Sequence, residues 1–223
     1  MYASISADIV SSTSQIGQSM IDLNNRLKEG LSILEKQYNG FWGRIVRGDT
    51  IECIIKNPVD ALEIALILKS WIKAYEPNHD NDNKRLKKYG LRLAIGIGNI
   101  NTIDKELDII DGEAIYLSGR SLDKLTGHSK YSMTISMANK QIEEPLSVII
   151  ELINQLITNA TGRRCLILFE RLLTSSSSET AKKLEISISG VNQSLNELGW
   201  AAIESAIKYY RKTVADYVGK SYI

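Results

Sequence analysis

The segment from Ser178 to Leu198 most constrains the fold of this chain. Ala181 and Leu184 share one face of a short helix. Three apolar residues repeat at helical spacing on a second helix: Val191, Leu195 and Leu198. Because these faces are apolar, the two helices can share a small core. The spacing predicts a helix-turn-helix unit whose second helix leaves one face free for a partner.

The helix caps agree with this division. Ser175 to Ser178 precede Glu179, which is a capping signal for the first helix, and Ser187 can cap the second. The outward, N-terminal side of the second helix carries small and amide side chains, which suit contacts to DNA base edges. The candidate DNA-binding residues are Ser187, Ser189, Gly190, Asn192, Gln193 and Asn196. The alternative is an ordinary helical hairpin with a polar surface.

The net charge limits how DNA could be bound. The chain has 27 Lys and Arg against 26 Asp and Glu, a formal net charge of +1, which argues against coating of nucleic acid by overall charge. Any DNA contact must therefore come from a local patch, and such charges can equally form a solvated face. The candidates are Arg163, Arg164, Lys182, Lys183, Lys208, Arg211 and Lys212.

The cellular compartment follows from the cysteines and the apolar runs. Cys53 and Cys165 form neither a metal spacing nor a disulfide framework, which fits a reducing compartment. No apolar stretch reaches membrane-spanning length, and the first residues lack a signal-peptide pattern. We expect a cytoplasmic globular protein that does not contact a membrane.

Hydrophobic periodicity divides the chain into two parts. Up to residue 137 it predicts the order β-α-β-β-α-β-α-β, which fits a ferredoxin-like sheet with an extension. These elements are strands at 2–10, 41–47, 50–56, 91–97 and 131–137 and helices at 16–34, 58–75 and 113–125. Helices alone follow, at 146–158, 162–173, the two short helices and 200–218. The predicted class is α+β, with domains at 1–140 and 141–223.

Three segments of the first part resemble class III nucleotidyl cyclases, in the same order along the chain. Ser6-Ala-Asp8-Ile-Val-Ser-Ser-Thr13 is similar to that family's first strand, and Gly43-Arg-Ile-Val-Arg-Gly-Asp49 is similar to its hairpin. Gly112-Glu-Ala-Ile-Tyr-Leu-Ser-Gly-Arg120-Ser-Leu122 resembles a later helix of the family. The resemblance covers about residues 1–137 and implies a cyclase-like domain of the ferredoxin type.

Two carboxylates and several phosphate-binding groups form the candidate site of this part. Asp8 at a strand end and Asp49 at a neighbouring hairpin could lie side by side, a pair that suits a divalent cation and substrate phosphates. The start of the long helix and two arginines could bind phosphate; these residues are Ser11, Ser12, Thr13, Arg44 and Arg47. For each residue taken singly, a turn-forming Asp or a surface ion pair is the alternative.

The resemblance assigns roles to three of these positions and a nucleotide to the site. It makes Asp8 and Asp49 the ligands of Mg²⁺ or Mn²⁺. It matches Arg120 with the arginine that stabilises the transferring phosphate, typically across a dimer interface. Tyr116 departs from the pattern, because the cyclases carry an asparagine there. Ile45 or Arg47, and Ile109, stand near the base-selecting positions, so base recognition is unsupported.

A degenerate cyclase-like domain joined to a helix-turn-helix resembles the SatD family of bacterial proteins. The resemblance implies a DNA-binding transcriptional regulator, and we expect its first domain to sense a nucleotide or to dimerise. We expect a homodimer because paired reader helices double the DNA contact surface and because the cyclase fold usually builds its site between two chains. The alternative is an active metal-dependent nucleotidyl cyclase or another nucleotide-processing enzyme. Gly96-Ile-Gly98 is interpreted as two glycines that ease a turn at a strand end, not as a phosphate loop.

Overall fold

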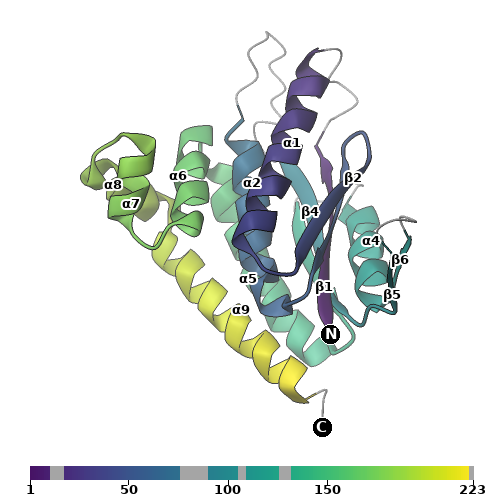
Figure 1. The fold of residues 1–223 in the computed structure, drawn as a ribbon. Helices are drawn as coiled ribbons and strands as arrows, with labels where there is room; N and C mark the ends of the chain where they lie inside the picture. Colours follow the sequence, from purple (N-terminus) through teal and green to yellow (C-terminus); the bar gives the residue numbers. More distant parts are fainter. Residues whose placement is uncertain (11–17, 76–89, 105–108, 126–131, 221–223) are drawn as a thin grey trace.

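Strand β1 (Tyr2–Ile9) lies at the centre of a five-stranded sheet with the order β2-β3-β1-β4-β7 (Figure 1). Its other strands are β2 (Phe41–Arg47), β3 (Thr50–Ile55), β4 (Leu91–Gly98) and β7 (Met133–Met137). β1 is antiparallel to β3 and β4, whereas β4 is parallel to β7. The first four strands have the ferredoxin-like arrangement and β7 extends it at one edge. The predicted α+β class and sheet are therefore confirmed.

The computed structural model describes residues 1–10, 18–75, 90–104, 109–125 and 132–220, apart from the side chains of residues 18, 19, 47 and 220. In this part the helices are α1 (Gln18–Gln37), α2 (Ala61–Lys73), α4 (Glu113–Leu125), α5 (Lys140–Asn159), α6 (Gly162–Leu173), α7 (Ser177–Leu184), α8 (Ile188–Leu198) and α9 (Trp200–Lys220). A short 3-10 turn, η2 (Pro58–Asp60), precedes α2. None of these helices is both long and apolar enough to cross a membrane.

The two faces of the sheet carry different side chains, because successive residues of a strand point to opposite faces. Ile5 and its apolar neighbours in β1 are buried in the main core, together with the apolar faces of α1 and α2. Ser4 and Ser6 point the other way and meet α4, where Ser118 hydrogen-bonds to both hydroxyls, at 3.1 and 2.8 Å. Asp8 lies on this second, more polar face.

Helix α2 connects the sheet to the C-terminal helices. Every residue of α2 except Glu63 is buried, which is expected of a mostly apolar helix that lies between two layers; Lys69, Ser70 and Lys73 are its buried polar residues. On the side of α6, the rings of Trp71 and Phe169 lie 4.5 Å apart. From α9, the buried Tyr210 hydroxyl donates to the Pro58 carbonyl oxygen at 3.1 Å. The main core therefore contains residues from both sides of the domain boundary predicted near residue 140. The division into two domains stays a prediction.

The predicted start of one helix is wrong, and one pair of strands is not predicted by the sequence. The helix predicted from residue 146 begins at Lys140, because Asn139 caps it and accepts a hydrogen bond from the Ile142 amide. Pro145 lies inside this helix. The structure also has an antiparallel pair of short strands that the sequence does not predict, β5 (Thr102–Asp104) and β6 (Ile109–Asp111), because each is too short to show an alternating pattern.

Candidate functional site

Helices α6, α7 and α8 form a cluster at one side of the molecule, away from α4, β5 and β6 (Figure 1). Ile167 of α6 packs with Ala181, Val191 and Leu195 in a small core of their own. Leu184, Ile186 and Trp200 pack against this core. The predicted pair of short helices and their shared apolar contact are therefore confirmed, while their binding to DNA stays a prediction.

Local capping positions α7 and α8. The Ser176 hydroxyl accepts a hydrogen bond from the Glu179 amide, and the Glu179 carboxylate accepts from both the amide and the hydroxyl of Ser175, at 3.0 Å each. These bonds lower the pKa of Glu179. Glu185 adopts a left-handed conformation (φ 54°), which ends α7, and the Ser187 hydroxyl then caps α8 by accepting from the Gly190 amide. The predicted caps are confirmed.

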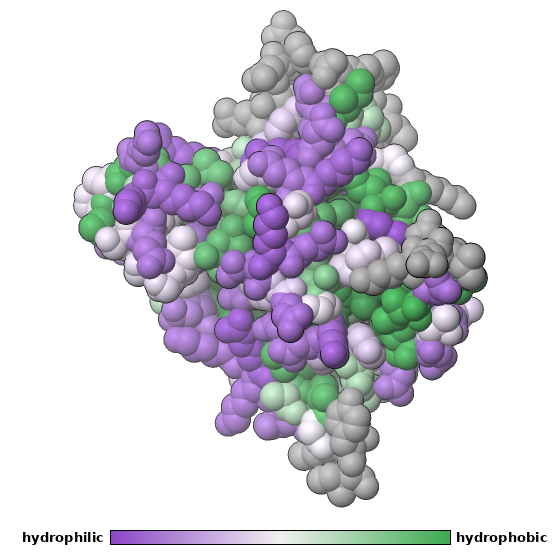
Figure 2. Space-filling view, in the orientation of Figure 1, coloured by the Kyte–Doolittle hydropathy of each residue, from purple (hydrophilic) through white to green (hydrophobic). Residues whose placement is uncertain are grey.

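The six candidate DNA-binding residues lie at the N-cap of α8 or within it, and all except Gly190 are exposed. Ser189, Asn192 and Asn196 are exposed, and their spacing puts them on one outward stripe of the helix. The surface over α7 and α8 is mostly hydrophilic (Figure 2). The other three, Ser187, Gly190 and Gln193, line a cavity of about 390 Å³ that α8 forms with α6.

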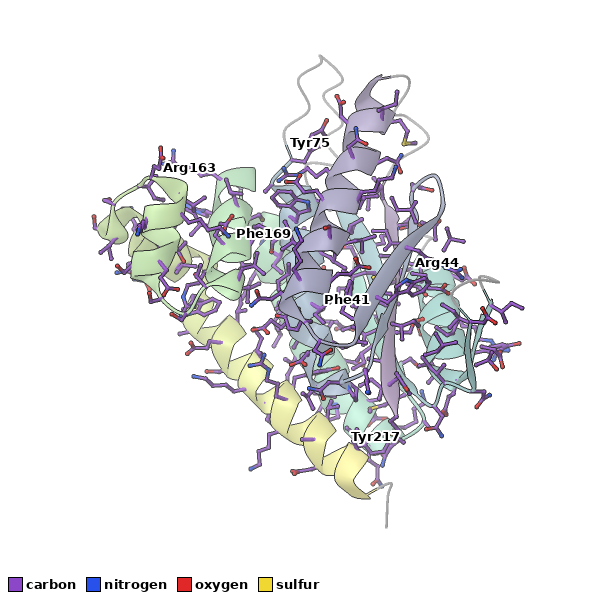
Figure 3. All side chains as sticks on the ribbon, viewed as in Figure 1. Phe41, Arg44, Tyr75, Arg163, Phe169 and Tyr217 are labelled. Carbon is purple, nitrogen blue, oxygen red and sulfur yellow. The ribbon has the colours of Figure 1, made fainter. Side chains whose placement is uncertain are left out.

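The charged and amide side chains that line the cavity mostly bind one another. Arg164 forms an ion pair with Glu197, and the Gln193 side-chain amide donates to the same carboxylate at 3.1 Å. The Gln193 side chain is thus held along α8 by Glu197, and its amide is less available for a contact to DNA than the amides of the outward asparagines. Arg163 also lines the cavity and projects from the end of the cluster (Figure 3).

Several lysines and arginines of the predicted basic patch are neutralised by carboxylates. Ion pairs join Lys183 to Glu170 at 2.7 Å, Lys208 to Glu204 at 2.9 Å and Arg211 to Glu63 at 2.6 Å. Within the described part of the chain, no ion pair is formed by Arg163, Lys182 or Lys212.

Asp8, the first predicted metal ligand, is held by an arginine on the next strand. Asp8 is the cross-strand partner of Arg92, and its two carboxylate oxygens accept hydrogen bonds from Arg92 Nε at 2.8 Å and Nη2 at 2.7 Å. Burial raises the pKa of Asp8, Arg92 opposes that shift, and the nearby charge of Asp49 adds to it. The predicted proximity of the two carboxylates is consistent with this effect.

Of the predicted phosphate-binding residues, Arg44 is the one whose side chain is described. It lies on β2 beside the polar face of the sheet (Figure 3) and bonds Glu52 through Nε at 2.9 Å and Nη2 at 2.7 Å. Ser11, Ser12 and Thr13, and the side chain of Arg47, lie outside the described residues.

Arg120 lies on α4 with its guanidinium 4.7 Å from the ring centre of Tyr116. Tyr116 is 58% exposed. The described residues contain no cluster of three or more His, Cys, Asp and Glu side chains that could hold a metal ion.

Arg92 decides the environment of Asp8, yet it is not among the site residues that the sequence predicts. The available signal was a single arginine between Leu91 and Leu93, which places it on the face opposite the apolar core. That pattern does not reveal which residue the arginine meets, because the partner depends on strand register.

Part of this chain is similar in structure to solved proteins. No protein-family model and no curated protein matches the chain. A structure of a bacterial light-regulated adenylyl cyclase shares 17% identity at a TM-score of 0.43, covering 60% of this chain and 74% of that one. A second such structure shares 20% identity at a TM-score of 0.44, covering 60% and 42%. A structure of Trypanosoma brucei adenylate cyclases in their monomeric state shares 13% identity at a TM-score of 0.36, covering 54% and 68%.

Proposed function

We propose that this chain is a DNA-binding regulator and that α8 enters the major groove. The observation that carries the proposal is the cluster of α6, α7 and α8, in which a separate small core holds α8 so that its polar stripe faces outward. Helix α7 has 8 residues and α8 has 11, and a tight turn joins them. A major groove accepts one such helix, with its N-terminal residues against the base edges.

The outward residues have the chemistry that base reading needs. Asparagine can donate to and accept from an adenine at the same time, and a serine hydroxyl can contact any base. Asn192 and Asn196 are one helical turn apart and Ser189 precedes them by one turn, so all three lie on the side away from the core. Lys182 of α7 and Arg163 of α6 remain to contact backbone phosphates.

The test is selection from a random duplex DNA library, followed by fluorescence anisotropy on the enriched duplex and on a scrambled one. We expect Asn192→Ala and Asn196→Ala each to weaken binding to the enriched duplex about tenfold, because a bidentate base contact contributes roughly 1–3 kcal/mol. Binding to the scrambled duplex should not change. Lys182→Ala should weaken both about equally, since a phosphate contact carries no sequence information.

The matched control is Gln141→Ala, which removes an exposed amide from the first turn of α5. It should bind both duplexes like the wild type. Failure of the wild type to enrich any sequence would contradict the proposal, as would unchanged affinity of both asparagine variants for the enriched duplex.

We extend this proposal to a SatD-type arrangement in which the sheet part forms a homodimer. Exposed side chains on contacting elements support it: Ile103 of β5 is 40% exposed, Ile109 of β6 is 51% exposed, and Tyr116 of α4 is 58% exposed. β6 contacts both β5 and α4. Hydrophobic surface is visible in this region (Figure 2). A two-fold dimer would present two copies of α8 to the two halves of a DNA site.

Light scattering coupled to size exclusion tests the dimer. We expect the wild type to have twice the 24.9 kDa chain mass, and an Ile109→Asp, Tyr116→Asp variant to have the monomer mass, because carboxylates cannot be buried unpaired in an apolar interface. Leu152→Asp, at a 65% exposed position on α5, is the matched control and should remain dimeric. A monomeric wild type would exclude the dimer, and a monomeric Leu152→Asp would move the interface to α5.

The alternative function is metal-dependent nucleotide processing of the cyclase type. The features in its favour are Asp8, Asp49 and Arg120, which stand at the positions that the resemblance assigns. The ion pair of Asp8 with Arg92 and the tyrosine at position 116 weigh against it. Cyclic product formed from ATP or GTP with Mg²⁺ or Mn²⁺, and lost in Asp49→Asn, would establish it.

A further inference from the structure

The Asp8–Arg92 pair is built into the sheet. The two residues face each other across neighbouring strands, and the planar guanidinium matches both carboxylate oxygens with a nearly equal pair of distances, 2.8 and 2.7 Å. Their side chains are only 15% and 21% exposed. A pair with this geometry is more persistent than an exposed surface ion pair, which water and salt weaken.

A divalent cation at Asp8 would meet an unfavourable environment. It would lie a few ångströms from the guanidinium, so like charges would repel, and the carboxylate charge that attracts a cation is already neutralised. Mg²⁺ bound by a protein takes one or two carboxylates and completes its octahedron with water and phosphate oxygens. Asp49 could be the second carboxylate, so the number of acids alone does not exclude a cation. The obstacle is the guanidinium of Arg92, which already occupies both oxygens of Asp8.

We infer that Arg92 stands in the place of a divalent cation at the C-terminal end of β1, so that Asp8 and Asp49 do not bind Mg²⁺ or Mn²⁺. Asp8 instead joins β1 to β4 through the guanidinium. Any anionic ligand at this site meets a positive charge that the protein itself supplies. The inference is independent of DNA binding by α8, and it separates this chain from the metal site implied by the cyclase resemblance.

Mn²⁺ binding tests the inference without any requirement for activity. Calorimetric titration of the wild type with MnCl₂ alone should show no binding up to millimolar concentrations. Arg92→Gln removes the positive charge while keeping a hydrogen-bond donor for Asp8, and it should gain measurable Mn²⁺ binding, with a Kd at least tenfold below the highest concentration at which the wild type shows none. Adding Asp8→Asn to this variant should abolish the gain.

Arg44→Gln is the matched control, because it removes the other guanidinium–carboxylate pair of this face, that with Glu52, and should not gain binding. Circular dichroism confirms that each variant is folded. Mn²⁺ binding by the wild type that is lost in Asp8→Asn would overturn the inference. Folded Arg92→Gln without a gain would also overturn it, and if that variant does not fold, the wild type and Asp8→Asn decide the matter by themselves.

Discussion

Replacing Gly96 by alanine is expected to destabilise the protein by about 3 kcal/mol, at the upper end of the usual cost of overpacking. Gly96 lies in β4 beneath α4. A Cβ atom there would stand 2.2 Å from the Ala114 carbonyl oxygen and 2.6 Å from the Ser118 amide nitrogen. Both are backbone atoms of α4, so no side-chain rotation relieves the clash and the helix must move off the sheet. Urea unfolding measures the loss.

Gly119→Ala is the matched control. Gly119 lies in the same α4, and a Cβ atom there meets nothing within 4 Å. Because alanine is the better helix former by roughly 1 kcal/mol, this variant should be slightly more stable than the wild type. Equal effects of the two substitutions would show that α4 does not pack on Gly96 as described.

The free energy of unfolding is expected to rise by about 2 kcal/mol between pH 7 and pH 8.5, and Lys69 is the cause. Lys69 is fully buried, and its Nζ donates to the Leu91 carbonyl oxygen at 2.7 Å and to the Ser132 hydroxyl at 2.8 Å. Burial lowers its pKa to about 7, and the charge of Lys73 adds to this shift while Cys165 opposes it.

The direction follows from proton counts in the two states. Above pH 7 the folded chain has lost the Lys69 proton, whereas the unfolded chain keeps it until its ordinary pKa of 10.5, so stability rises with pH in that interval. Below pH 7 both states hold the proton and the dependence ends. Burial also raises the pKa of Cys165 from 9.0 to about 11, which lowers stability as pH rises above 9. Burial raises the pKa of Cys53 as well, but the unfolded chain keeps most of its thiol protons below pH 8.5, so Lys69 dominates the range from pH 7 to 8.5.

Denaturant unfolding at pH 6.5, 7.5 and 8.5 measures this slope. Lys69→Met fills a similar volume without a titrating group, so its stability should be nearly constant over the range. Lys36→Met, on the exposed side of α1, should retain the slope of the wild type. A slope that survives in Lys69→Met would assign the proton to another group.

Local patterns in the sequence were enough for the elements and their caps. The alternation in β1, the repeat in α1 and the capping serines Ser176 and Ser187 act between residues a few positions apart, and the structure has them where the patterns indicate. Gly96 shows where such patterns fail. The strand pattern predicts a strand that contains Gly96, but it does not predict why a glycine is needed there: the backbone of α4 packs against it and leaves no space for a Cβ atom.

The candidate sites divide in the same way. The sequence by itself determined the α+β class, the order of the sheet elements and the paired short helices α7 and α8, since helical and strand periods are local properties. Only the tertiary structure decided that Arg92 holds Asp8, that Lys69 is buried beneath Leu91 and Ser132, and that Gln193 turns toward α6. These contacts depend on strand register and helix packing, which join residues far apart in the chain and leave no periodic trace in the sequence.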